Sequence, residues 1–260
     1  MNIVVPMAGQ NERFRAAGIE MPKPLIDVRG RPMYAWAVDS LPLALARRLI
    51  FLCLEEHLRN RALAADIEAR YAAHRPEIVA LREVTAGQAA TVLLVREAID
   101  RDEPLLIYNA DTGFRSPLAA RLNALPAEVD GLIGVFRAAG ERWSFARVDE
   151  AGRVVETAEK RRISEWATTG LYYFTRGADF VRHAEAMIAA DDRVNGEFYV
   201  APVYNRMIAA GADVRIDPAE EIWVLGTPED LARFELDHPR EERGAPARSR
   251  SQTPGEKSPA

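Results

Sequence analysis

Two basic side chains follow a short apolar segment near the N-terminus. Residues 3–5 have strand character, and the chain then turns through Gly9 before it reaches Arg13 and Lys23, the latter between two prolines. A loop at the carboxyl end of a parallel strand leaves backbone N–H groups free to bind phosphate oxygens. Arginine adds a planar fork of donors, and the lysine adds a second cation on a stiff segment. The sequence therefore predicts that residues 3–25 form a phosphate-binding strand, loop and helix.

A carboxylate follows another expected strand. Residues 104–108 are mostly apolar, and Asn109 and Asp111 come directly after them. At the carboxyl edge of a sheet, Asp111 would lie across from the first loop, where a hard cation that bridges phosphates needs an oxygen ligand. An Asx turn or a helix N-cap is the alternative role for such a residue. Asp111 is our candidate metal ligand.

A turn of small residues follows the strand expected over 77–84. It contains Gly87 and Gln88 and opens a helix that we expect to run to about residue 100. A glycine lets a flat ligand approach the backbone, and a glutamine offers both a donor and an acceptor to the edge of a base. Taken alone, the segment fits an exposed glutamine at a helix start equally well.

Composition limits the class of protein. The chain has 260 residues, 48% of them hydrophobic, which is ordinary for a globular protein. Its net charge of -5 offers no general attraction for nucleic acid. The single cysteine, Cys53, lies in an apolar run and can form no internal disulfide, which fits a reducing compartment. No apolar run approaches the roughly 18 residues of a membrane span. We therefore expect an unexported, cytoplasmic protein without membrane insertion.

The order of elements is typical of an α/β protein. In the first half we expect strands at 3–5, 47–55, 77–84 and 104–108, with helices between them, as in a doubly wound parallel sheet. From Gly131 the expected strands are shorter and separated by turns, which indicates antiparallel additions that close one side of a pocket. These strands cover 131–137, 143–148, 153–158 and 169–174. The predicted fold is a three-layer, Rossmann-like α/β fold with a mixed, mainly parallel sheet.

The C-terminal part returns to helices and short strands. We expect helices over 180–189 and from Asn195 through Met207, strands at 214–216 and 221–225, and a last helix that Thr227 caps. From His238 the composition turns to Arg, Ser, Pro and Gly without apolar periodicity. The sequence therefore predicts one domain over 1–237 and a disordered tail over 238–260.

The N-terminal segment resembles a known family. Its matches to the signature loop of the sugar-1-phosphate nucleotidylyltransferases, AGxGxRF followed by PKPL, are Ala8, Gly9, Arg13, Phe14 and residues 22–25. Asn11 stands in place of the second glycine, and asparagine visits positive φ more readily than most residues. Glu12 replaces a small hydroxyl residue, and its carboxylate would repel a triphosphate unless it points away or meets a cation. The resemblance extends over about residues 1–235.

The resemblance implies a reaction between two phosphorylated substrates. A phosphate oxygen of a sugar 1-phosphate would attack the α-phosphorus of a nucleoside triphosphate (NTP), and pyrophosphate would leave. In that chemistry Arg13 would support the pyrophosphate, Lys23 the α-phosphoryl oxygens, and Asp111 a Mg²⁺ ion. The residues implied to bind the nucleotide are Ala8, Gly9, Asn11, Gly87 and Gln88.

The same resemblance assigns the sugar side of the pocket to the antiparallel strands. Lys160 belongs to an "EK" pair at a strand end, and Glu197 belongs to the segment NGEFY. An exposed ion pair is the alternative for Lys160, and a favourable charge at the first turn of a helix is the alternative for Glu197. The residues implied to bind the sugar phosphate are Asn109, Lys160, Gly170 and Glu197.

One position departs from the family pattern at the implied metal site. Many relatives have W-x-D-x-G-T, in which the aspartate is a second metal ligand, and Val224 occupies that position here. Either Asp217 or Glu197 substitutes for it, or the metal is held by Asp111, water and substrate phosphates, as Mg²⁺ often is. The sequence leaves these alternatives open.

Two other functions are compatible with these residues. A glycosyltransferase that uses a nucleotide-sugar also places a carboxylate at a strand end, but such enzymes generally hold their metal with a D-x-D pair, and Thr112 and Gly113 follow Asp111 here. A binding protein without turnover is favoured by Glu12 and Val224. No zinc-ligand spacing, G-x-S-x-G elbow or P-loop is found. The sugar, the base and the oligomeric state, including a homo-oligomer, stay open.

Overall fold

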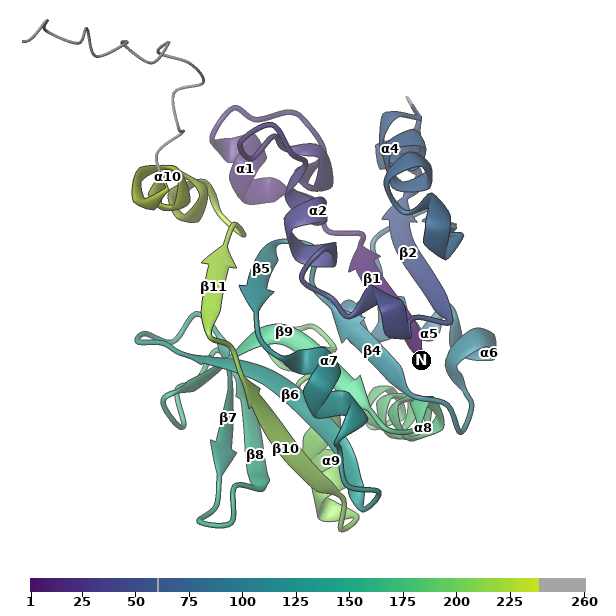
Figure 1. Cartoon of the computed structure of the whole chain (residues 1–260), viewed down its shortest axis with the longest axis vertical. Coiled ribbons are helices and arrows are strands. Elements are labelled where there is room, and N and C mark those ends of the chain that lie inside the picture. The colour runs from purple at the N-terminus through teal and green to yellow at the C-terminus, as the bar shows by residue number, and fades with distance from the viewer. Residues whose placement is uncertain (60, 239–260) are drawn as a thin grey trace, which may run out of the picture.

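The first half of the chain forms a parallel sheet. The computed structural model describes residues 1–59 and 61–238. Strands β1 (Asn2–Met7), β2 (Arg48–Leu54), β3 (Glu77–Leu81) and β4 (Leu105–Tyr108) run parallel in the order β4-β1-β2-β3. Figure 1 shows β1 between β2 and β4, with their carboxyl ends at the same edge. The segments after these strands therefore meet at one edge of the sheet.

The second half extends this sheet with antiparallel pairs. Strand β9 (Trp166–Phe174) pairs antiparallel with both β4 and β6 (Val129–Arg137), and β10 (Asp213–Pro218) adds to β6 in parallel. Strands β7 (Ser144–Val148) and β8 (Val154–Glu159) form a hairpin that joins the sheet through β9. The sheet is thus mixed, as the sequence predicted.

Alternating side chains of the central strands pack into two cores, one on each face. In β1, Val4 belongs to one core, whereas Ile3 and Val5 belong to the other. Strand residues alternate between faces, so an unbroken apolar strand is buried on both sides. The first face is covered by α5 (Gln88–Leu93), α6 (Arg96–Ile99), α8 (Gly177–Ala189) and α9 (Val203–Ala209). The second is covered by α2 (Met33–Val38), α4 (Ala62–Arg70) and α7 (Leu118–Asn123).

A smaller unit joins the two ends of the described chain. Strands β5 (Thr112–Arg115) and β11 (Glu221–Val224) form a separate antiparallel pair, and β11 leads to α10 (Pro228–Asp237). Phe14 of α1 (Glu12–Ala16) and Phe234 of α10 belong to a third apolar cluster. Figure 1 shows α1 and α10 next to each other at one end of the molecule. The first loop is therefore held against the last helix.

Several boundaries differ from the expected ones. The predicted three-layer, mainly parallel α/β fold is confirmed, and the side chain of Thr227 caps α10 by accepting a hydrogen bond from the Asp230 N–H. The helix predicted from Asn195 is wrong, because Asn195 and Gly196 have φ of 51° and 83° and form a tight turn between Val194 and Glu197. Between β2 and β3, where the sequence predicted helical structure, the chain forms the short α3 (Glu55–Leu58) and then α4.

Two further expectations concern the chain ends and membranes. The predicted tail falls, from residue 239 on, outside the described residues. Among the described helices, none combines the length and apolar character needed to cross a bilayer.

Candidate functional site

A cavity of about 790 Å³ lies between the loop after β1 and the antiparallel strands. Its lining includes most of the residues that the sequence singled out, although they come from segments far apart in the chain. These are Ala8, Gly9, Asn11, Arg13, Lys23, Gly87, Gln88, Asn109, Asp111, Gly170 and Glu197. The side chains predicted to neutralise phosphate charge, to bind a base and to bind a sugar thus share one cavity.

The first loop is fixed by an asparagine in the left-handed region. Asn11 has φ 63°, a positive value that asparagine tolerates better than most residues, as expected for a residue in place of a glycine. Its side-chain Nδ2 donates to the Met21 carbonyl at 2.9 Å, which ties the loop to the segment that leads to Lys23. Glu12 is exposed and also lines the cavity. The loop therefore places a cation and a carboxylate at adjacent positions, Glu12 and Arg13.

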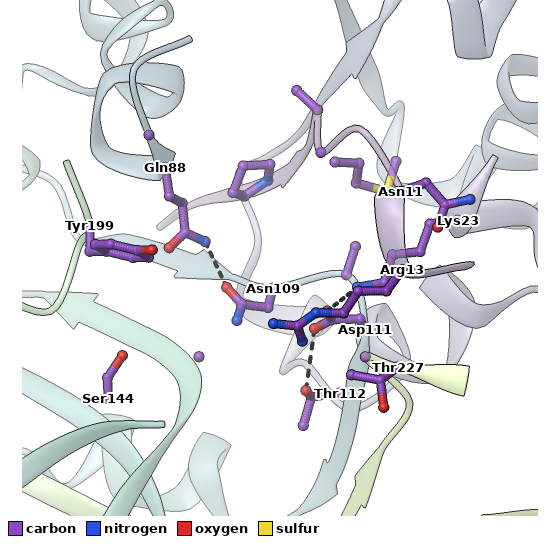
Figure 2. Close-up of a pocket in the computed structure, with 18 of the residues that line it drawn as sticks. Asn11, Arg13, Lys23, Gln88, Asn109, Asp111, Thr112, Ser144, Tyr199 and Thr227 are labelled. Carbon is purple, nitrogen blue, oxygen red and sulfur yellow. Dashed lines mark hydrogen bonds and ion pairs between the residues drawn. The ribbon is translucent and has the colours of Figure 1, made fainter. Parts of the chain in front are cut away.

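Lys23 and Asp111 form an ion pair in the cavity. Lys23 Nζ donates to Asp111 Oδ2 at 2.6 Å, and their side chains are 26% and 27% exposed. Figure 2 shows this pair with Arg13 beside it. Burial raises the pKa of Asp111, but the charge and hydrogen bond of Lys23 outweigh burial and leave that pKa below its ordinary value. Asp111 is therefore ionised at neutral pH.

A glycine makes room for this ion pair. A Cβ atom on Gly226 would lie 3.1 Å from Asp111 Oδ2 and 3.9 Å from Lys23 Nζ. The segment after β11 therefore packs directly against the carboxylate, and a side chain there would move it.

A second polar group lies between the two sides of the cavity. Gln88 Nε2 donates to Asn109 Oδ1 at 2.6 Å, and Figure 2 shows Asn109 between Gln88 and the Lys23–Asp111 pair. Gly170 has φ +85°, and a Cβ atom there would lie 2.3 Å from Asn109 Nδ2. Asn109 thus has its position because β9 carries a glycine at this point.

The turn before Gln88 is bound to the NGEFY segment. Gly87 has φ +133°, and a Cβ atom there would lie 2.4 Å from the Phe198 nitrogen. The Phe198 N–H donates to the Ala86 carbonyl at 2.8 Å, and the Ala89 N–H donates to the Phe198 carbonyl at 2.9 Å. The predicted base-binding turn and the predicted sugar-binding segment therefore form one unit.

A half-buried carboxyl group that the sequence did not assign also lines the cavity. Glu159 accepts a hydrogen bond from Ser144, its register partner in the β7–β8 hairpin. Burial raises the pKa of Glu159, and the nearby Glu197 adds to this. Because hairpin partners on one face lie side by side, the "EK" motif together with the hairpin pattern could have indicated Ser144.

Lys160 is placed differently from the expectation. It has φ 49°, and its Nζ donates to the Tyr199 hydroxyl at 2.7 Å. Tyr199 lines the cavity, and among the described lining residues Lys160 does not appear. In this geometry Lys160 supports the cavity through Tyr199 instead of facing it.

The residues around Asp111 define what a cation would meet. Val224 lines the cavity and pairs with Thr112 in the β5–β11 ladder. Asp217 is 1% exposed and accepts hydrogen bonds from Arg121 and Ser116. It does not appear among the described lining residues, so its position gives no support to the alternative in which it replaces the missing ligand. In the described part of the chain, no group of three His, Cys, Asp or Glu residues could hold a metal.

The donor set at Asp111 nevertheless fits one kind of metal binding. The protein offers a single ionised carboxylate and the Thr112 hydroxyl, which lies 3.4 Å from Asp111 Oδ1. Mg²⁺ commonly takes one or two carboxylates and completes its shell with water and substrate phosphates. The site fits a cation that arrives with its phosphates better than one bound by protein groups alone.

Comparison with known proteins decides the family. A family model for nucleotidyl transferases matches residues 3–236. The chain belongs to the nucleotidyl transferase family. The matched residues include both sides of the cavity, so this nucleotidyl transferase carries its site within the family domain, and the resemblance seen in the sequence is confirmed.

Curated relatives of this nucleotidyl transferase are longer proteins. The bifunctional protein GlmU of Cupriavidus necator is 26% identical over 250 residues, and that of Burkholderia thailandensis is 27% identical over 254 residues. These matches cover 91% and 92% of this chain but only 51% and 52% of the two relatives. The chain thus spans about half the length of the curated relatives that it matches.

Solved structures show the same fold along the whole domain. A nucleoside-diphosphate-sugar pyrophosphorylase from Vibrio cholerae RC9 has a TM-score of 0.74 and 28% identity, and the match covers 89% of this chain and 98% of that one. An inositol-1-phosphate CTP transferase from T. maritima has a TM-score of 0.68 and 17% identity, over 90% and 96% of the two chains. The second match shows the fold alone.

Proposed function

We propose that this protein transfers a nucleotidyl group from an NTP to a sugar 1-phosphate, giving a nucleoside-diphosphate-sugar and pyrophosphate. The observation that carries the proposal is the cavity, in which Arg13 and the Lys23–Asp111 pair share a lining with Gln88 and with Glu159. Figure 2 shows Arg13, Lys23 and Asp111 on one side and Gln88, Tyr199 and Ser144 on the other. Phosphate-neutralising groups thus lie across one cavity from the segments proposed to bind the base and the sugar (Figure 2).

The proposed chemistry needs positioning and charge neutralisation. An oxygen of the sugar phosphate attacks the α-phosphorus, the bond between that phosphorus and the oxygen bridging to the β-phosphate breaks, and pyrophosphate leaves with the electron pair. Lys23 stabilises the α-phosphoryl oxygens, and Arg13 stabilises the leaving group. Asp111 holds Lys23 in place through the 2.6 Å hydrogen bond. Preorganised cations of this kind stabilise charge that develops in the transition state.

Asp111 is also the protein ligand proposed for Mg²⁺. When bound, the ion would neutralise phosphate charge. The Thr112 hydroxyl is the neighbouring oxygen donor, and Val224 leaves the remaining ligands to water and phosphates.

The two remaining groups of residues are proposed to select the substrates. Gln88, with Gly87 and the loop residues Ala8, Gly9 and Asn11, binds the nucleotide. On the other side, Asn109, Gly170, Glu197 and, through Tyr199, Lys160 contribute to the sugar-phosphate site. We add Glu159 to this group because a half-buried carboxyl group that lines the cavity can bind sugar hydroxyls in either protonation state. We also propose a cytoplasmic location for the protein, in agreement with its free, buried Cys53.

A direct assay tests the proposal. The protein is incubated with MgCl₂, each of the common NTPs and a panel of sugar 1-phosphates, and pyrophosphate is measured. Pyrophosphate release that requires both substrates supports the proposal. A nucleotide-sugar-dependent glycosyltransferase would instead release nucleoside diphosphate from a nucleotide-sugar. Thermal stabilisation by ligands without pyrophosphate from any pair would show a binding protein without turnover.

A further inference from the structure

An ion pair joins two segments that line the cavity from different parts of the chain. Arg142 lies in the connection between β6 and β7, and Asp230 lies in the first turn of α10. Arg142 Nη1 and Nη2 donate to the two carboxylate oxygens at 3.1 and 2.6 Å, and both residues line the cavity. The side chain of Asp230 is 11% exposed and that of Arg142 is 50% exposed. The guanidinium is therefore the accessible member of the pair.

Short contacts connect this pair to the proposed phosphate site. Thr227 Oγ1 donates to Asp230 Oδ2 at 3.0 Å. Gly226, the preceding residue, packs so closely against Asp111 that a Cβ atom on it would lie 3.1 Å from the Asp111 carboxylate. Three contacts and the peptide bond between Gly226 and Thr227 thus lead from the Lys23–Asp111 pair to Arg142.

The charges of two guanidinium groups act on a second acidic residue in the first turn of α10. The pKa of Glu229 is below its ordinary value because of its own backbone N–H and the Thr227 hydroxyl, and because of the charges of Arg13 and Arg142. Arg13 comes from the first loop and Arg142 from the β6–β7 connection. The two cations therefore approach the first turn of α10 from separate segments.

The guanidinium of Arg142 is contacted on one face and one edge and keeps a free donor. Its Cζ lies 4.1 Å from the ring centroid of Trp143, so one face is packed, and Asp230 occupies the edge formed by Nη1 and Nη2. Within the described residues, its Nε makes no hydrogen bond. Arginine has five N–H donors in a planar fork, so one bound carboxylate leaves donors for a second anion.

We propose that Arg142 binds a substrate phosphate and that Asp230 is a positioning residue that fixes the Arg142 guanidinium toward the cavity. This inference rests on the proposed function and adds to it a phosphate-binding cation. Lys160 does not take that role, because its Nζ donates to the Tyr199 hydroxyl. The phosphate belongs either to the NTP or to the phosphate monoester of the acceptor, and the experiment separates these two sources.

Four variants and two matched controls test the proposal. Arg142→Ala removes the guanidinium, and Arg142→Lys keeps its charge without the fork. Arg137 is the control, because it also stacks on a tryptophan, Trp166 at 4.9 Å, and pairs with Glu165 at 3.0 Å, but it lies outside the described lining. Asp230→Asn and Asp230→Ala test the positioning role, with Glu165→Gln as their control. Thermal unfolding shows which variants are folded.

Two readouts are used for every folded variant. Isothermal titration calorimetry measures the Kd of inorganic pyrophosphate and of inorganic phosphate, and steady-state kinetics measure KM for the NTP and for the acceptor separately. We expect Arg142→Ala to raise the Kd of one of the two anions, and the KM of the matching substrate, by roughly tenfold to a hundredfold. Weaker binding of pyrophosphate would assign Arg142 to the NTP, and weaker binding of phosphate would assign it to the acceptor. Arg142→Lys recovers part of this loss, and Arg137→Ala has wild-type values.

For the Asp230 variants, the direction of the change in anion affinity decides between two roles. If Asp230 only added negative charge near the phosphate, its removal would tighten anion binding. If it positions Arg142, Asp230→Asn weakens binding in the same arm as Arg142→Ala, whereas Glu165→Gln does not. Tighter binding by Asp230→Asn would overturn the positioning role, and wild-type binding by Arg142→Ala in both arms would overturn the proposal. If the wild-type protein releases pyrophosphate and Arg142→Ala has the same Kd and KM values, the role of Arg142 is refuted but the proposed function is not.

Discussion

Replacing Lys23 by methionine should separate activity from stability. The change keeps most of the side-chain volume but removes the cation whose Nζ lies 2.6 Å from Asp111 Oδ2. Loss of one preorganised donor to a developing negative charge typically lowers kcat by roughly 10²–10³, or about 2.7–4 kcal/mol of transition-state stabilisation. The pair is about one-quarter exposed, so its loss should lower the free energy of unfolding by only about 1–2 kcal/mol. Pyrophosphate release and urea unfolding measure the two quantities.

Arg48→Met is the matched control. Arg48 pairs with Glu77 at 2.5 Å, their side chains are 35% and 41% exposed, and neither is among the described residues lining the cavity. We expect this variant to lose stability like Lys23→Met but to keep the wild-type rate. If both variants lost activity only in proportion to their loss of stability, the catalytic role of Lys23 would be refuted.

The pH dependence of stability supplies an independent check on Lys23→Met. The pKa of Asp111 lies below its ordinary value of 3.8, because Lys23 outweighs the effect of burial. The unfolded chain therefore takes up this proton at a higher pH than the folded protein does. The stabilisation is complete above pH 3.8 and is lost as the pH falls through the folded pKa. Without Lys23, burial would leave the pKa of Asp111 above 3.8 in the folded variant. The stability difference between wild type and Lys23→Met should therefore begin to shrink while the pH is still above 3.8 and continue to shrink as the pH falls through the folded pKa of the wild type, as measured by urea unfolding at a series of pH values.

Three further outcomes are expected. Gly170→Ala should lower the free energy of unfolding by about 1–3 kcal/mol, because it combines φ +85° with a Cβ 2.3 Å from Asn109 Nδ2; Gly140→Ala, with φ +83° and no described atom within 4 Å, should lose less in the same melts. Glu159→Gln should gain stability relative to wild type as the pH rises above 4.5, because the raised pKa means that ionising Glu159 opposes folding; a pH-independent difference in urea unfolding would contradict this. Removal of Mg²⁺ with EDTA should abolish pyrophosphate release, and release that survives EDTA would rule out the metal proposed at Asp111.

The sequence predicted the parts of the site that depend on strand order. Lys23 and Asp111 meet because β1 and β4 are parallel neighbours and the segments after them leave the same edge of the sheet. The position of Asn11 followed from its tolerance of positive φ. Local patterns and the rule for parallel strands were sufficient for these predictions.

The parts that the sequence could not predict depend on side-chain direction and on long-range contacts. Lys160 adopts a positive φ, which turns it toward Tyr199, and no local pattern indicates this. Asp217 is buried by Arg121, a partner 96 positions away. The pairing of Arg142 with Asp230 joins residues 88 positions apart. Such contacts are set by the packing of whole segments, which single-residue preferences do not determine.

The turn at Asn195 and Gly196 was missed for a different reason. Asparagine followed by glycine is a strong signal for a tight turn with positive φ at both residues. A helix was instead predicted to begin at Asn195, and the turn geometry prevailed. The result places Glu197 after a turn instead of at the beginning of a helix.

The fate of isotope-labelled oxygen tests the central claim most directly. A sugar 1-phosphate with ¹⁸O in its phosphate is incubated with an NTP, Mg²⁺ and the protein, and the products are analysed by mass spectrometry. If the two substrates react within the cavity, all of the label stays in the nucleoside-diphosphate-sugar, including its bridging oxygen, and pyrophosphate contains none. Label in pyrophosphate, or release of nucleoside monophosphate with an oxygen from water in place of a sugar conjugate, would contradict the account.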